Sequence, residues 1–102
     1  MAGNAKSPGA RDLAAAIAAL KTPDEATRFL RDLTTPAEMR AFEERWAIAQ
    51  MLDEGRPYRD IAEALGGSTT TVARVARFLR DEPHQGYRLL LDRLAAPSRG
   101  KN

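Results

Sequence analysis

A short segment rich in threonine and arginine carries the side chains best suited to recognise another molecule. Between Gly66 and Arg80 the sequence has three threonines, three arginines and no acidic residue. A threonine hydroxyl can donate or accept a hydrogen bond at a base edge. An arginine can pair with guanine or hold a phosphate. These residue types therefore indicate double-stranded DNA as the partner.

The helical period predicts which of these side chains point outward. At about 100° per residue, the buried face of a helix at about 69–80 would hold Val72, Ala76 and Leu79, with Val75 at its edge. The N-terminal turn of such a helix normally enters the major groove. The residues expected to read bases are Thr69, Thr70, Thr71, Ala73 and Arg74. Those expected to hold phosphates are Arg56, Tyr58, Arg59, Arg77 and Arg80.

The spacing around this segment predicts a helix-turn-helix at about 58–80. Ala62 is small enough for two helices to cross there, Gly66 tolerates the positive φ of a tight turn, and Ser68 can cap the second helix. The apolar side chains expected to face inward are Ile61 and Leu65 on the first helix and Val72 and Val75 on the second. Helix pairs with this spacing also occur as purely structural hairpins, but the absence of acids from residue 66 to residue 80 favours the binding interpretation.

The remaining pattern predicts an all-α fold of six helices. Thr22-Pro23 and Thr35-Pro36 are each followed by a glutamate in capping-box position, which predicts helix starts there. The helix after Thr35 should end near Asp53, with Gly55 as its C′ residue. Its apolar stripe consists of Met39, Phe42, Trp46, Ala49 and Leu52. A stripe this broad fits either a central core helix or a helix that also packs on a second subunit.

Composition limits the remaining possibilities. In 102 residues there is room for one domain, expected at 11–96 between a disordered leader at 1–10 and a flexible tail at 97–102. The chain has no cysteine and one histidine, so we expect no metal site, no cofactor and no enzymatic activity. No apolar run is long enough to span a membrane, and a cytoplasmic location fits. Acids outnumber bases by four between residues 12 and 54, whereas bases outnumber acids by three between residues 56 and 80.

Several motifs together resemble one known family. They are Leu33-Thr34-Thr35-Pro36-Ala37-Glu38, Arg45, Leu52-Asp53-Glu54-Gly55, Tyr58-Arg59-Asp60-Ile61, Leu65-Gly66, Thr71-Val72-Ala73-Arg74 and Pro83. From about Leu20 to Leu94 the chain resembles the Trp repressor family, and within it the YerC/YecD-like subfamily. The resemblance implies a six-helix subunit in an intertwined dimer and a repressor of transcription initiation.

The resemblance also implies a possible effector pocket. In the Trp repressor a threonine and two arginines surround the bound tryptophan, and Thr35, Arg45 and Arg74 stand at the matching positions. The tryptophan-responsive proteins have glycine after the second arginine, where this chain has Val75. Because the branched side chain would occupy the space of the indole, we do not expect tryptophan to be the effector. A smaller ligand, or none, is expected.

Three functional hypotheses follow. The first is a homodimeric, sequence-specific DNA-binding repressor. The second is a helical module that binds a protein partner, for which Phe78 could be either dimer core or an exposed anchor. The third is a repressor that binds DNA only when a ligand other than tryptophan lies near Arg45 and Arg74.

Overall fold

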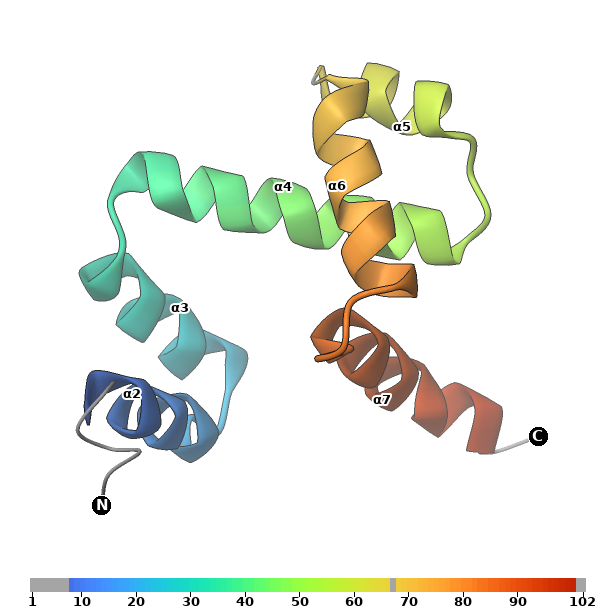
Figure 1. Cartoon of the computed structure of the whole chain (residues 1–102). Helices are drawn as coiled ribbons and strands as arrows, with labels where there is room; N and C mark the ends of the chain where they lie inside the picture. The colour runs from blue at the N-terminus through green and yellow to red at the C-terminus, as the bar shows by residue number, and fades with distance from the viewer. Residues whose placement is uncertain (1–7, 67, 101–102) are drawn as a thin grey trace. The chain divides into compact units, whose positions relative to one another are not determined.

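Six α-helices make up the described part of the chain (Figure 1). The computed structural model describes residues 8–66 and 68–100, and no strand occurs within them. The helices are α2 (Pro8–Ala19), α3 (Pro23–Leu33), α4 (Pro36–Asp53), α5 (Tyr58–Leu65), α6 (Thr69–Arg80) and α7 (Gly86–Gly100). The all-α fold class and the six helices predicted from the sequence are confirmed.

The two ends of the chain differ from the expected boundaries. Residues 1–7 and 101–102, which belong to the expected leader and tail, lie outside the described residues. Helix α2 includes residues 8–10 and α7 continues to Gly100, so the helices extend beyond the expected domain of 11–96. The chain forms two compact units, residues 1–39 and 40–102. No described helix combines the length and the apolar character needed to cross a membrane.

Capping threonines open α3 and α4 as predicted. The Thr22 hydroxyl accepts a hydrogen bond from the Glu25 N–H at 3.1 Å, and the Glu25 carboxylate accepts one from the Lys21 N–H at 2.8 Å. The Thr35 hydroxyl accepts from the Glu38 N–H at 3.1 Å, and the Glu38 carboxylate accepts from the Thr35 N–H at 2.8 Å. Because these bonds satisfy N–H groups that lack a partner within the helix, they fix where each helix begins.

The unit formed by residues 1–39 buries little apolar surface. No residue of α3 is buried, and Leu13 and Ile17 of α2 and Leu33 of α3 remain 40% to 50% exposed. Leu13 and Ile17 are four residues apart and therefore share one face of α2, and α3 is strongly amphipathic. The unit thus exposes apolar surface along both helices.

The core of the unit formed by residues 40–102 lies where α4, α5, α6 and α7 meet. Its buried side chains are Ile48, Ala49, Ile61, Ala62, Val72, Val75 and Leu91. Trp46 stacks against Tyr87 beside them, with ring centroids 6.4 Å apart. Val75 is only 1% exposed, so its predicted place at the edge of the buried face was wrong. Helix α6 packs against both α5 and α7, and this widens its buried face.

Helix α4 is covered over only part of its apolar stripe. Ile48 and Ala49 are its only buried residues, whereas Phe42 is 45% exposed. The helix ends in a Schellman motif, as Gly55 predicted: the Gly55 N–H donates to the Leu52 carbonyl at 2.9 Å and the Arg56 N–H to the Met51 carbonyl at 3.2 Å. Gly55 has φ +86°, which glycine adopts without steric cost.

Candidate nucleic-acid interface

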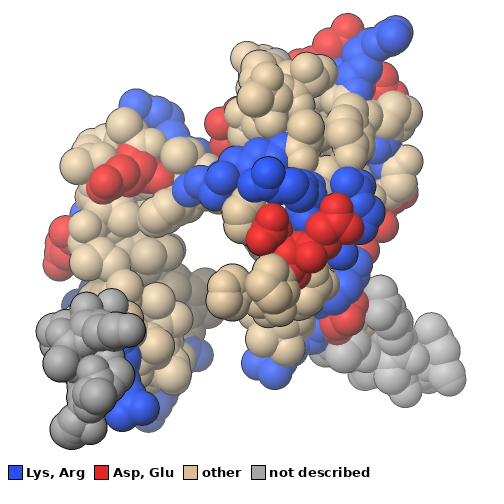
Figure 2. All heavy atoms as spheres, viewed as in Figure 1, with Lys and Arg blue, Asp and Glu red and all other residues tan. Residues whose placement is uncertain are grey.

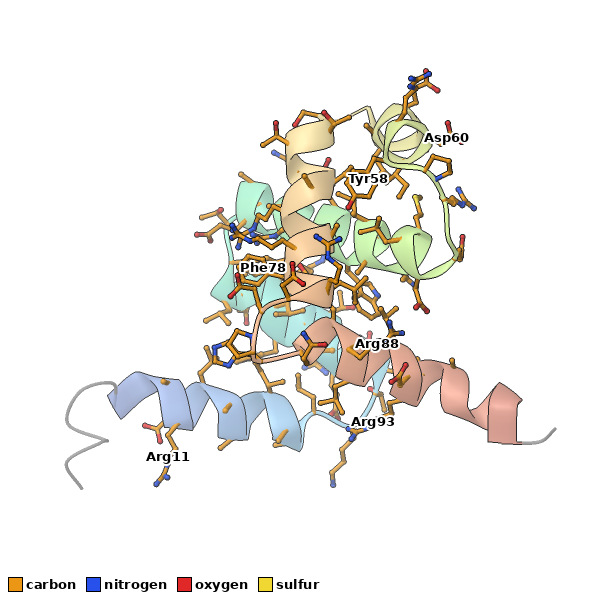
Figure 3. All side chains as sticks on the ribbon, turned by 45° about the vertical axis from the view of Figure 1, so that its right-hand side comes forward. Arg11, Tyr58, Asp60, Phe78, Arg88 and Arg93 are labelled. Carbon is orange, nitrogen blue, oxygen red and sulfur yellow. The ribbon has the colours of Figure 1, made fainter. Side chains whose placement is uncertain are left out.

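A tight turn joins α5 and α6 in the manner of a helix-turn-helix. Gly66 adopts the left-handed conformation with φ +65°, and its N–H donates to the carbonyls of Ala62 and Glu63. Gly67, the next residue of the predicted turn, lies outside the described residues. Ser68 then caps α6, because its hydroxyl accepts a hydrogen bond from the Thr71 N–H at 3.4 Å. In Figures 1 and 3, α6 runs across the C-terminal half of α4, with α5 beside its N-terminal end.

The residues predicted to read bases gather at the N-terminal half of α6, on the side away from the core. Thr69, Thr70, Ala73 and Arg74 are exposed, and Thr71 is half-buried. Val72, Val75 and Ala76 point the other way and are buried. The structure therefore brings four of the five predicted base-reading residues together on one exposed face of α6, which we call the readout face and which consists of Thr69, Thr70, Ala73 and Arg74.

Arginine and aromatic side chains meet further along the same helix. The Arg74 guanidinium lies 4.5 Å from the centre of the Phe78 ring, and the Arg77 guanidinium lies 5.1 Å from it. Phe78 itself is half-buried. Both distances are within the range of a cation–π interaction. Sequence reasoning left the role of Phe78 open, although its spacing of four residues from Arg74 places the two on one helix face.

Three of the arginines predicted to hold phosphates are paired with acids. The ion pairs are Arg56–Glu54 at 3.0 Å, Arg77–Glu82 at 3.4 Å and Arg80–Asp81 at 3.4 Å. Within the described residues no ion pair is recorded for Arg59 or Arg74. Figure 2 shows basic side chains gathered over the C-terminal half of α6, with acidic ones directly beside them. The acid-free segment is thus followed at once by the acids that pair with its last arginines.

Tyr58 connects the beginning of α5 to the end of α6. Its hydroxyl, and then the Asp81 carboxylate, raise the pKa of the Arg80 guanidinium above its ordinary value. Tyr58 and Arg80 line a groove of 560 Å³ together with Arg56, Arg88 and apolar residues of α4 and α6. Tyr58 and Phe78 lie on opposite sides of α6 (Figure 3).

Arg88 is a structural arginine that sequence reasoning missed. Its guanidinium donates to Asp53 at 2.7 Å and to Asp92 at 3.0 Å, which raises its pKa. The first bond joins α7 to the C-terminal end of α4. The spacing of four residues between Arg88 and Asp92 would have predicted their pairing, but the sequence had no signal for the contact with Asp53.

The residues of the possible effector pocket belong to two different units of the chain. Thr35 caps α4 within the unit formed by residues 1–39. In the other unit the Arg45 guanidinium lies 5.4 Å from the centre of the Phe42 ring, while Arg74 lies over Phe78. Val75 is packed into the core. The pocket therefore stays a prediction. Across residues 8–66 and 68–100, no group of three or more His, Asp or Glu side chains is placed to hold a metal ion.

Comparison with known proteins places the chain in a family. The model of the Trp repressor protein family matches residues 10–95. The uncharacterized protein YerC of Bacillus subtilis is 38% identical over 78 residues, which cover 76% of this chain and 74% of that protein. The crystal structure of a TrpR-like protein from Eubacterium eligens superposes with a TM-score of 0.80 at 39% identity, covering 90% of this chain and 94% of the other. The Trp repressor family consists of DNA-binding regulators and not of enzymes, in agreement with the prediction. The chain is therefore a YerC-like member of the Trp repressor family.

Proposed function

We propose that the protein is a sequence-specific transcriptional repressor that binds double-stranded DNA as a homodimer, with α6 in the major groove. The observation that carries this proposal is the readout face. It combines the hydroxyls of Thr69 and Thr70, the methyl group of Ala73 and the guanidinium of Arg74 on the exposed side of α6. Such groups can read base edges, and the family consists of regulators that bind DNA.

The flanking basic residues would supply the affinity that does not depend on sequence. Arg56, Tyr58, Arg59, Arg77 and Arg80 are all exposed and lie on or beside the helix-turn-helix. Contacts from such residues to phosphates release counterions, so binding should weaken steeply as the salt concentration rises. A bacterial repressor of this kind acts in the cytoplasm, which is the location we propose.

Exposed apolar surface supports the proposed homodimer. Leu89, Leu90 and Leu94 of α7 are 52%, 41% and 62% exposed, and Leu13, Ile17 and Leu33 are similarly open. A soluble monomer rarely exposes many large apolar side chains on helix faces, and a second copy would cover them. Two recognition helices related by twofold symmetry would meet half-sites about 34 Å apart, so the operator should be close to a palindrome.

The direct test is enrichment of random duplex DNA on the purified protein at roughly physiological salt, without added ligand. We expect a near-palindromic sequence with half-sites about one helical turn apart. We expect Arg74→Ala to abolish specific binding while the circular dichroism spectrum stays unchanged. Arg28→Ala, which removes the same charge from α3, is the matched control and should bind as the wild type does. Unchanged operator affinity of the Arg74 variant would exclude Arg74 from readout.

The other two hypotheses gain less support from the geometry. A protein-binding surface usually exposes a large aromatic or aliphatic anchor, whereas the readout face exposes threonine, alanine and arginine, and Phe78 beside it is half-buried beneath two arginines. A ligand near Arg45 and Arg74 would have no space at Val75, which is fully packed. Failure of the enrichment without ligand, followed by success when cell metabolites are added, would establish the effector-dependent repressor instead.

A further inference from the structure

One aromatic ring on α6 is covered by two guanidinium groups. Arg74 precedes Phe78 by four residues and Arg77 precedes it by one, and their guanidinium carbons lie 4.5 Å and 5.1 Å from the ring centre. The ring is half-buried, and a phenylalanine side chain has less rotamer freedom than an arginine, while both arginines are exposed. Contact with the ring therefore restricts two arginine side chains, which would otherwise be among the most mobile side chains on the helix.

The two arginines differ in what remains available to a partner. The Nε–H of Arg77 faces Glu82 at 3.4 Å, so part of its hydrogen-bonding edge is occupied. For Arg74 the described residues provide the ring contact and no ion pair. A guanidinium held by its face keeps its N–H groups free at the edge, where a guanine or a phosphate would accept them.

We propose that Phe78 is a positioning residue, which holds the Arg74 guanidinium on the readout face before DNA arrives. The inference rests on the proposed function, because Arg74 is there a base-reading residue. Ordering the long side chain in advance reduces the entropy that is lost when DNA binds. Because α6 itself supplies the ring, this ordering requires no small-molecule ligand.

The test compares Phe78→Leu, which keeps an apolar side chain but removes the ring, with Phe78→Tyr, which keeps the ring. The affinity of each is measured on the enriched duplex and on a random duplex. We expect Phe78→Leu to weaken binding to the enriched duplex by about two- to fivefold per subunit, as loss of an exposed cation–π contact implies. Phe78→Tyr should bind as the wild type does. In an Arg74→Ala background only the residual, sequence-independent affinity remains to be measured, and Phe78→Leu should have little further effect on it.

Nuclear magnetic resonance relaxation of the Arg74 Nε–H in the DNA-free protein separates positioning from simple structural support. We expect its order parameter to fall in Phe78→Leu and to recover in Phe78→Tyr. An order parameter of Arg74 that stays unchanged in Phe78→Leu would overturn the proposal. So would a loss of affinity on Phe78→Leu that is as large in the Arg74→Ala background as it is in the wild type. If the wild type binds no duplex, the proposed function fails, whereas the order parameter still decides whether Phe78 holds Arg74.

Discussion

Replacing Glu82 by glutamine should strengthen DNA binding. Glu82 pairs with Arg77 at 3.4 Å, and the two side chains are 35% and 57% exposed. A phosphate that engages Arg77 must compete with this ion pair, which at such exposure is worth about 0.2–1 kcal/mol. Glu82→Gln removes the competing charge and keeps the shape of the side chain. Binding should therefore tighten by up to about fivefold per subunit, and by up to about 25-fold for a dimer in which both pairs are broken.

The gain should be the same for the operator and for a random duplex, because phosphate contacts carry no sequence information. Fluorescence anisotropy on both duplexes over a series of salt concentrations measures it, and the gain should shrink as salt screens the charges. Glu43→Gln changes the net charge equally on α4, where no ion pair is recorded for Glu43 in the described part of the chain. Unchanged or weaker binding of Glu82→Gln would refute the reasoning, and so would a gain that Glu43→Gln matches.

Two further changes test the phosphate residues and the turn. Arg80→Ala should weaken binding to all duplexes alike and reduce the slope of log affinity against log salt by about one per subunit, whereas a loss confined to one operator would contradict a phosphate role. Gly66→Ala should lower the free energy of unfolding by about 1–2 kcal/mol in a urea titration, because φ is +65° at that residue. Nothing lies within 4 Å of an added Cβ there, so strain rather than a clash is the cause. Gly66→Asn should cost less, since asparagine tolerates this conformation, and an equal cost would contradict the explanation.

Local signals in the sequence predicted the helix ends and the turn well. The threonine caps of α3 and α4, the Schellman motif at Gly55 and the left-handed Gly66 all follow from short-range chemistry. Each depends only on residues within about six positions of one another. At these positions the backbone conformation is fixed by the residue's own side chain and by its near neighbours in the sequence.

The sequence was less informative about features that depend on contacts between elements far apart in the chain. The helical period placed Val75 at an edge, because it cannot show that α6 is covered by both α5 and α7. The same period gave α4 one long stripe, although only its C-terminal half has buried residues. Pairing of Arg77 with Glu82 also depends on how the chain turns after α6, and counting charges along the sequence does not show that turn.

The open faces of α2 and α3 have a thermodynamic consequence. Short helices that bury no side chain are marginal on their own in water, and α3 buries none. If a second copy of the chain supplies the missing contacts, the folding of α2 and α3 depends on dimerisation and therefore on protein concentration. The melting temperature would then rise with protein concentration, and the amides of α2 and α3 would exchange with solvent fastest in dilute samples. At low protein concentration, the folding of these two helices would then itself limit how much of the protein is associated.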